Sequence, residues 1–460
     1  APAQPQAAQL CGSGVSVNIP PLAKTTTTKT TVTTSSMLLR DALAVEKETS
    51  SGLYLDTLTG ARAVAVMWVF VLHIWKFAGE GALPVTTPFG VWFDLQHFVA
   101  QGEWGVRLFF ALSGFLLSLP YLTRESKKKT FWNNTATFYE RRALRILPGY
   151  YAILLVLLIT GVLGLTTLPS ASLMFGHTAF INFWWMEPAL LGVFWTLPVE
   201  ITFYLLFPWL VKLLKPRSWW VLLIGCILAA FISRFLMRHY ALNGHEWVWG
   251  FGSSFAAQME FFIFGMLAAL CFVRIKPSPR TGDLCMIFGA LLMALMVWAT
   301  GPRVMDLIHW YGSIHYAFYV PSALAIAVFV FGAAAGGPLA RALLANRVMM
   351  FIGTISFSLY LWHTFFMLLI TFDPRHFGEP STWRSVAIAS LFVLPPTLMA
   401  AYASYRWVEL PFLKIRHHAQ GTHAGWFSRH PMLTLALAAA TLVFLTGIAN
   451  LTVHLALPVK

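Results

Sequence analysis

Residues 146–166 read ILPGYYAILLVLLITGVLGLT, a run without a single charged residue. The hydrocarbon core of a bilayer is about 30 Å thick and is crossed by roughly 20 apolar residues in an α-helix, so this run is long enough for one crossing. Only helices and closed barrels satisfy their backbone hydrogen bonds inside a bilayer. Because the run lacks the alternating hydrophobicity of a barrel strand, it predicts a transmembrane α-helix.

The remainder of the chain has the same apolar character. Of its 460 residues, 58% are hydrophobic and 11% are charged, whereas soluble domains carry about 25% charged residues. We predict an all-α fold, a polytopic transmembrane helix bundle with a ten-helix core and one extra C-terminal span. The eleven spans are expected at about residues 60–78, 104–122, 146–166, 195–214, 218–237, 255–273, 283–300, 315–335, 348–372, 384–406 and 433–455.

The distribution of positive charge predicts an orientation. Cytoplasmic loops of membrane proteins carry an excess of Lys and Arg. With the N-terminus inside, about three quarters of the 32 Lys and Arg residues fall on the inside. Eleven crossings then place the C-terminus outside. Membrane topology therefore accounts for the net charge of +14, and we expect no nucleic-acid partner.

Three segments are expected along the chain. Residues 1–52 are rich in Ala, Pro, Gln and Thr and contain no apolar stretch long enough for a signal peptide, which predicts a disordered cytoplasmic tail. Residues 53–416 form the predicted ten-span domain. Residues 417–460 are expected to form a polar cytoplasmic loop and the eleventh span.

Several common catalytic and metal motifs are missing from the sequence. The four cysteines include no CxxC pair and no zinc-type spacing, so neither a disulfide framework nor a metal is expected. The sequence His245-Glu246-Trp247-Val248-Trp249 begins like a zinc-protease motif, but Trp249 stands where the second histidine ligand is required.

Ionisable residues at membrane depth are costly and are candidate functional residues. Arg62 and His73 both fall in the first predicted span. Eleven helical steps amount to about three turns, so the two side chains share a face, about 16 Å apart along the axis. The alternative interpretation is an arginine that snorkels to the membrane surface and a histidine that only packs.

Two later spans carry further polar residues. Glu200 lies near the start of the fourth span, with Tyr204 one turn further on the same face; alternatively, this carboxylate is held by interfacial water. The ninth span places Ser356, Tyr360 and His363 on one face, at positions i, i+4 and i+7. That pattern is also typical of polar contacts that hold membrane helices together.

A basic cluster, Glu140-Arg141-Arg142-Ala143-Leu144-Arg145, stands in the predicted loop before the third span. It is compatible with a positive anchor on the inner membrane surface. Alternatively, it binds an anionic cytosolic cofactor, because the arginine fork matches phosphate oxygens.

Taken together and in order, these segments resemble the acyltransferase-3 family of integral membrane acyltransferases. The matching pieces are Arg62 and His73 with ten residues between them, GVRLFFALSGFL at 105–116, RRALRILP at 141–148, WTLPVE at 195–200 with Phe203-Tyr204, SFSLYLWH at 356–363, and RWVELP at 406–411. The resemblance covers about residues 53–416.

The resemblance implies transfer of an acyl group, often acetyl from cytosolic acetyl-CoA, to hydroxyls of a sugar-bearing acceptor at the outer face. Acceptors in the family include surface polysaccharides, peptidoglycan-type glycans and macrolide antibiotics. Two positions depart from the family pattern: Arg107 stands where many relatives carry Asp, and Thr196 where many carry Ser. Because only one span follows residue 416, we expect no appended hydrolase domain.

We therefore predict a multi-pass membrane O-acyltransferase that uses acyl-CoA, with acetyl-CoA as the expected donor, and a carbohydrate or glycosylated small-molecule acceptor. His73 is the predicted catalytic base, and Glu200 the catalytic group that orients or charge-stabilises its imidazole. The other predicted site residues are Arg62, Ser113, Arg142 and Arg145 for the donor, and Tyr204, Tyr360 and His363 as substrate-lining residues.

Some alternatives stay open at this point. Direct transfer and a route through acylated His73 both fit the sequence. A transporter or lipid flippase would also bury ionisable residues, although it would be expected to show inverted repeats or broken spans. A catalytically inactive receptor or scaffold would tolerate replacement of His73.

Overall fold

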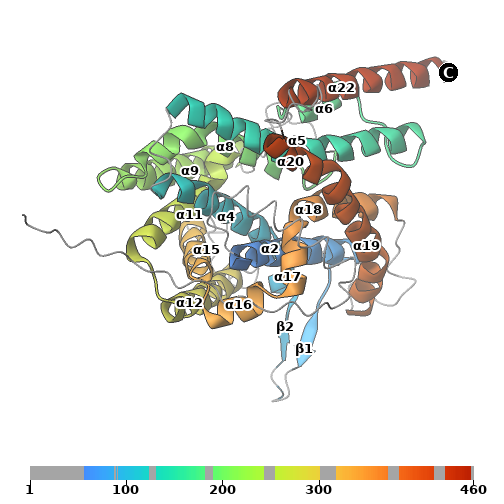
Figure 1. Cartoon of the computed structure of the whole chain (residues 1–460). Helices are drawn as coiled ribbons and strands as arrows, with labels where there is room; N and C mark the ends of the chain where they lie inside the picture. The colour runs from blue at the N-terminus through green and yellow to red at the C-terminus, as the bar shows by residue number, and fades with distance from the viewer. Residues whose placement is uncertain are drawn as a thin grey trace, which may run out of the picture.

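The structure is a computed structural model that describes residues 56–86, 90, 92–123, 131–181, 190–242, 254–300, 318–370, 383–418 and 430–456. Within these residues it is a bundle of long α-helices with one small hairpin (Figure 1). Two features discussed above lie outside the described residues: the predicted tail at 1–52 and the sequence His245 to Trp249.

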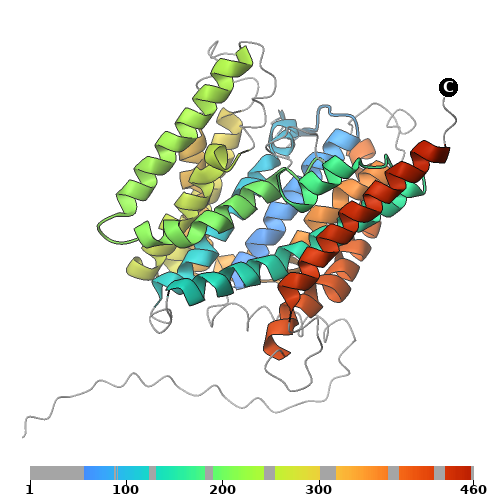
Figure 2. The ribbon, with the colours of Figure 1, turned by 90° about the horizontal axis from the view of Figure 1, so that it is seen from above.

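Ten long helices form most of the bundle, and α2, α5 and α22 run in broadly the same direction (Figure 2). They are α2 (Asp56–Phe77), α4 (Glu103–Leu122), α5 (Phe131–Val162), α8 (Thr196–Leu213), α9 (Trp219–Leu242), α11 (Phe255–Ile275), α12 (Pro279–Ala299), α15 (Tyr319–Ala334), α19 (Trp383–Ala403) and α22 (Pro431–Ala456).

Among the described residues, nine helices are long and apolar enough to cross a membrane, and two bent helix pairs bring the number to as many as eleven. The bent pairs are α15 with α16 (Pro338–Leu344), at 101°, and α17 (Arg347–Thr354) with α18 (Ser356–Leu369), at 72°. Each predicted span coincides with one of these helices or pairs. The predicted all-α polytopic bundle is confirmed.

The third span is longer than expected. We predicted a loop up to residue 145, but α5 begins at Phe131 and contains the whole arginine cluster. No glycine or proline interrupts the chain between residues 131 and 147, so the helix continues into a polar first half. As a consequence, Arg142 and Arg145 are fixed on a helix surface that packs inside the bundle.

Close helix contacts depend on small residues. A Cβ at Gly114 of α4 would overlap with the carbonyl oxygen of Phe262, and a Cβ at Gly265 of α11 would overlap with that of Ala111. Each helix thus presents a glycine to the backbone of the other. Such close approach is how membrane helices gain packing energy without a hydrophobic driving force between them.

A π-helix, η4 (Ser404–Glu409), follows α19 and leads into α20 (Leu410–His418). π-turns shift the register of the residues that follow and are frequent at functional sites. Here the shift coincides with a buried carboxylate, Glu409, which accepts a hydrogen bond from Ser358 of α18.

A small antiparallel hairpin of β1 (Pro84–Thr86) and β2 (Trp92–Asp94) follows α2, and the short helix α3 (Gln96–Ala100) comes after it. The Asp94 carboxylate accepts from the backbone amides of Leu83 and Gln96, at 2.8 and 2.9 Å. The helix α6 (Ala171–Thr178) lies in the connection after α5, where α22 packs on both of them (Figure 1).

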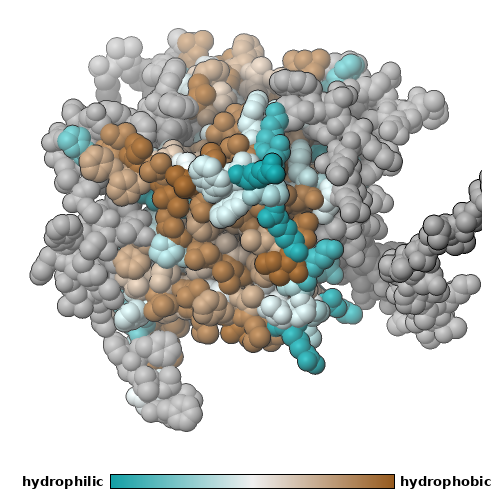
Figure 3. Space-filling view, turned by 90° about the vertical axis from the view of Figure 1, so that its left-hand side faces the viewer, coloured by the Kyte–Doolittle hydropathy of each residue, from teal (hydrophilic) through white to brown (hydrophobic). Residues whose placement is uncertain are grey.

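The surface of the bundle is strongly apolar. Large hydrophobic side chains of α9 stand exposed, among them Phe231 and Phe235. In the view of Figure 3, hydrophobic residues cover most of the described surface, and hydrophilic ones gather in a band across it. An extended apolar surface of this kind is adverse in water and suited to contact with lipid.

Candidate active site

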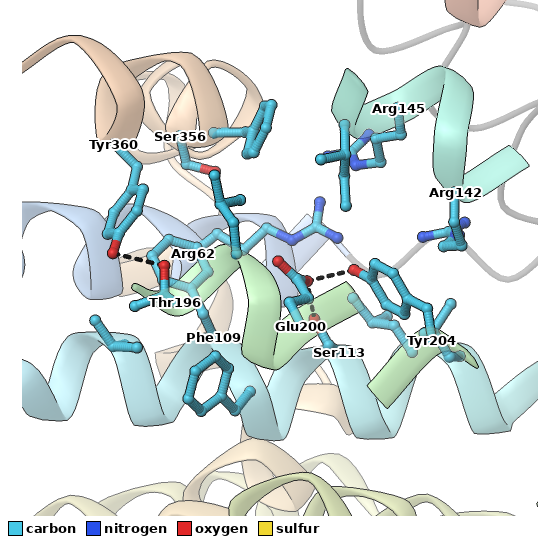
Figure 4. A pocket seen from close by; sticks show the side chains of 17 residues that line it. Arg62, Phe109, Ser113, Arg142, Arg145, Thr196, Glu200, Tyr204, Ser356 and Tyr360 are labelled. Atoms are coloured by element: carbon cyan, nitrogen blue, oxygen red, sulfur yellow. Dashed lines mark hydrogen bonds between the residues drawn. The ribbon is translucent and has the colours of Figure 1, made fainter. Parts of the chain in front are cut away.

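A cavity of about 100 Å³ lies between α2, α4, α5, α8 and α18 (Figure 4). Its polar lining residues come from all five helices. They are Arg62, Ser113, Arg142, Arg145, Thr196, Glu200, Tyr204, Ser356 and Tyr360. Seven of the nine predicted site residues line this cavity, whereas the two histidines, His73 and His363, do not.

Glu200 is the acidic residue on this wall. Its Oε1 accepts hydrogen bonds from the Ser113 hydroxyl, at 3.0 Å, and from the Tyr204 hydroxyl (Figure 4). The contact with Tyr204 matches the one-turn spacing predicted from the sequence. These two hydroxyls fix the carboxylate on one side of the cavity, facing the arginines.

Three arginines give the cavity a positive character. Arg62 extends from α2, while Arg142 and Arg145 extend from the first half of α5 (Figure 4). The Arg142 guanidinium carbon lies 5.9 Å from the ring centre of Tyr204, and its buried Nε has no hydrogen-bond partner among the described residues. With one carboxylate against three guanidinium groups, the site carries a net positive charge that suits an anionic ligand.

Tyr360 closes the other end of the cavity. Its hydroxyl lies 2.8 Å from the Thr196 hydroxyl and donates to the backbone carbonyl of Val193 at 2.9 Å. Both hydroxyl groups are buried, so these bonds hold α18 against the start of α8. The Tyr360 ring also lies 5.9 Å from that of His363, which connects the cavity wall to the histidines behind it.

His73 and His363 form a pair next to this wall. Nε2 of His363 lies 3.3 Å from Nδ1 of His73, and the ring centres are 5.0 Å apart. His363 is completely buried, whereas His73 retains some exposure. Each ring also forms a hydrogen bond with a backbone carbonyl, that of Val69 for His73 and that of Leu359 for His363.

Glu200 and His73 are not hydrogen-bonded to each other among the described residues. Within the described residues, the hydrogen bonds of Glu200 go to Ser113 and Tyr204, and those of His73 go to Val69 and His363. Glu200 lines the cavity and His73 does not, although Arg62 of the same helix as His73 does. Sequence spacing within one helix could not reveal this.

Several further charged residues inside the bundle were not among the predicted site residues. Arg234 of α9 pairs with Glu260 of α11, and its guanidinium carbon lies 4.2 Å from the ring centre of Tyr319. Arg107 donates to the hydroxyl of the same tyrosine at 2.9 Å. In the sequence, each of these charged residues could have been recognised as an ionisable residue within an apolar run. Glu409, in the last of the six matching segments, carried the same signal.

His177 forms a separate buried site in α6, outside the spans. Its Nε2 accepts from the backbone amide of Leu190 at 3.1 Å, and its Nδ1 lies 3.0 Å from the Tyr150 hydroxyl. Burial lowers the pKa of His177 to about 4. The ring is therefore neutral and joins α6 to the chain that enters α8. Within the described residues, no group of three or more His, Cys, Asp or Glu side chains could hold a metal ion.

Comparison with known proteins now identifies the family. The family profile described as an acyltransferase domain matches residues 55–406. The chain belongs to the acyltransferase-3 family. The match covers the cavity, the histidine pair and the first five of the six segments quoted from the sequence, and it ends at the first residue of the sixth, Arg406. No solved structure matches the chain.

Three relatives illustrate the acyltransferase-3 match. A Staphylococcus aureus (strain COL) protein, provisionally named an O-acetyltransferase, is 25% identical over 78% of this chain and 58% of its own length. The O-acetyltransferase OatA of S. aureus (strain NCTC 8325 / PS 47) is 23% identical over 86% of this chain and 63% of its own length. The acyltransferase MdmB of Streptomyces mycarofaciens is 32% identical over 36% of this chain and 42% of its own length. The chain thus spans less than two thirds of the length of each of these relatives.

Proposed function

We propose that this chain transfers an acyl group, acetyl in the simplest case, from cytosolic acyl-CoA to a hydroxyl of a carbohydrate or glycosylated acceptor at the opposite membrane face. The observation that carries the proposal is the arginine-lined cavity that ends at Tyr360, with the His73–His363 pair directly behind it. The names of OatA and MdmB as an O-acetyltransferase and an acyltransferase point in the same direction.

The proposed orientation assigns the donor to the arginines. Arg62, Arg142 and Arg145 lie in the halves of α2 and α5 that the charge distribution places on the inside. Guanidinium groups bind phosphate oxygens through charge-assisted, often bidentate hydrogen bonds. The phosphates of acyl-CoA would therefore lie at this end, with the acyl group extending along the cavity toward Tyr360.

The proposed reaction requires a base on the acceptor side. His73 lies in the second half of α2, toward the outside in this orientation. In a direct transfer, the acceptor hydroxyl loses its proton to His73 as its oxygen bonds to the thioester carbonyl carbon. The carbon–sulfur bond then breaks, and the imidazolium returns the proton to the departing thiolate. A route through acylated His73 would use the same nitrogen as nucleophile.

The first prediction tests this assignment through His73→Gln. General base catalysis typically contributes about 10²–10⁴ in rate, and a glutamine amide does not accept protons near neutral pH. We expect the variant to insert and fold, and to lose detectable transfer of radiolabelled acetyl from acetyl-CoA to a panel of glycan acceptors in membrane vesicles. Protein amount and thermal unfolding are measured alongside. Near-normal turnover by the folded variant would show that His73 is not the catalytic base and only packs within the bundle.

A transporter or flippase remains the rival. It would move a labelled substrate across vesicle membranes without forming a new ester. Mass spectrometry of the acceptor after incubation separates the two activities, because only a transferase adds the mass of an acyl group. Transport without esterification would contradict the proposed function.

A further inference from the structure

The histidine pair has a defined hydrogen-bond direction. A backbone carbonyl oxygen can only accept, so Nδ1 of His363, 3.2 Å from the Leu359 carbonyl, must carry a proton for that bond to form. Its Nε2 is then a lone-pair acceptor. By the same argument Nδ1 of His73, 2.8 Å from the Val69 carbonyl, carries a proton as well.

The two assignments fit each other. The Nδ1–H of His73 has a second acceptor in the Nε2 lone pair of His363, at 3.3 Å. No carboxylate is hydrogen-bonded to either ring among the described residues, and Glu103 and Lys76 act on His73 only through their more distant charges. Burial keeps the His363 ring away from water and fixes its orientation.

This direction decides which nitrogen of His73 can react. With the proton on Nδ1, the lone pair is on Nε2, which makes no hydrogen bond among the described residues. When Nε2 takes a proton from a hydroxyl, Nδ1–H remains a donor to Val69 and His363, and both acceptors stabilise the imidazolium. An orienting partner of this kind holds both the tautomer and the ring position of a catalytic histidine.

We propose that His363 is the positioning residue of the reaction, which fixes His73 as the Nδ1–H tautomer and so exposes Nε2 to the acceptor hydroxyl. The proposal rests on the proposed function, and it gives His363 the orienting role that the sequence had suggested for Glu200. Both the direct route and the acyl-histidine route need the Nε2 lone pair, so the proposal holds for either.

The experiment compares His363→Leu with His363→Gln in the purified full chain in lipid nanodiscs. Leucine removes the acceptor, whereas Oε1 of glutamine can accept from the same Nδ1–H. We expect His363→Leu to lower kcat by about 10- to 100-fold, the range found when the hydrogen-bond partner of a metal-ligating histidine is removed. KM for acetyl-CoA should stay unchanged, because the arginines are untouched. His363→Gln should remain within about threefold of the wild-type kcat.

A second readout follows the tautomer directly. With ¹⁵N-labelled histidine, the His73 resonances, assigned by their absence in His73→Gln, should show protonated Nδ1 and unprotonated Nε2 in the wild type. In His363→Leu a population with protonated Nε2 should appear. Trp362→Phe serves as the matched control on α18, since Trp362 contacts Phe365 and Phe366 rather than His73, and we expect no change in kcat or tautomer.

The possible results distinguish a failure of the positioning role of His363 from a failure of the proposed acyltransferase function. Unchanged kcat and an unchanged His73 tautomer in folded His363→Leu, in an enzyme that His73→Gln inactivates, would overturn this inference and leave the proposed function intact. Protonated Nε2 on His73 of the wild type would also overturn it. A wild type that transfers no acyl group would overturn the proposed function and the catalytic role of the pair together.

Discussion

At the scale of single residues, the arginine-lined end of the cavity, which we propose binds the donor, has its charged groups already in place without a ligand. Arg142 sits against the Tyr204 ring, and Tyr204 in turn donates to Glu200. The arginine is therefore placed by the same groups that hold the carboxylate. An anionic donor would meet a fixed guanidinium rather than a mobile one, which reduces the entropy lost on binding.

The second prediction concerns Arg142→Ala and Arg145→Ala. A hydrogen bond to a charged group contributes about 1.5–3 kcal/mol, which corresponds to roughly a 10- to 100-fold change in affinity. We expect KM for acyl-CoA to rise by this factor with little change in KM for the acceptor, measured by steady-state transfer at varied donor and acceptor concentrations.

Arg280→Ala is the control, because Arg280 is an exposed arginine at the start of α12 that does not line the cavity. Its KM values should match those of the wild type. A selective loss of acceptor affinity in Arg142→Ala would move this residue out of the donor site.

The third prediction concerns pH and His177. Its pKa is about 4 in the folded protein against 6.5 for the ordinary group, so its stabilising effect is complete above pH 6.5 and is lost as the pH falls toward 4. The total is up to roughly 3 kcal/mol. We expect the Tm of the purified protein to fall over this interval, and to fall less in His177→Gln, whose amide oxygen can accept from Leu190 without titrating. Equal pH dependence of the two proteins would contradict the assignment.

At the scale of helices, the contact of α4 with α11 determines whether the cavity wall forms. Ser113 lines the cavity, and its neighbour Gly114 faces the Phe262 backbone. A larger residue at 114 would separate the two helices and displace the serine. Overpacking of this kind typically lowers the free energy of unfolding by about 1–3 kcal/mol, and by more where the added side chain overlaps with backbone atoms.

The fourth prediction is that Gly114→Leu lowers the Tm and the yield of folded protein, measured by fluorescence-detected size exclusion in detergent. Gly225→Leu is the matched control, because a Cβ at Gly225 of α9 meets no atom within 4 Å. We expect the control to behave like the wild type. Equal behaviour of the two variants would show that the α4–α11 contact tolerates side chains.

The spans were predictable because hydropathy and length decide where a chain crosses a bilayer, whatever the other helices do. The pair Glu200–Tyr204 was predictable for a similar reason, since both residues lie on one helix. The bend at Ile355 was not, because the only nearby marker is Gly353, and an isolated glycine in a helical pattern can equally serve a close helix contact, as Gly353 does against the Thr59 backbone. The His73–His363 contact joins residues 290 positions apart and depends on how α2 meets α18. The spacing of residues along one helix cannot predict contacts between two helices.

At the scale of the whole molecule, the orientation in the membrane decides which substrate reaches which end. The fifth prediction uses single cysteines in a background without the four native ones. Lys215→Cys, between α8 and α9, should react with an impermeant maleimide only after the cells are opened. Ser172→Cys, in α6, should react in intact cells. Both positions are exposed in the structure. Reversed labelling would invert the proposed orientation and with it the sides of donor and acceptor.

The closure of the cavity by Tyr360 also affects whether ions can leak through the protein. A cavity lined by three arginines and continuous with the opposite face would be an anion leak. The hydroxyl contacts of Tyr360 with Thr196 and Val193 end the cavity inside the protein. In the proposed reaction, only a short uncharged acyl group has to pass this point, while the phosphates remain with the arginines. In the proposed reaction, the acyl group would thus cross the membrane without loss of the ion gradients across it.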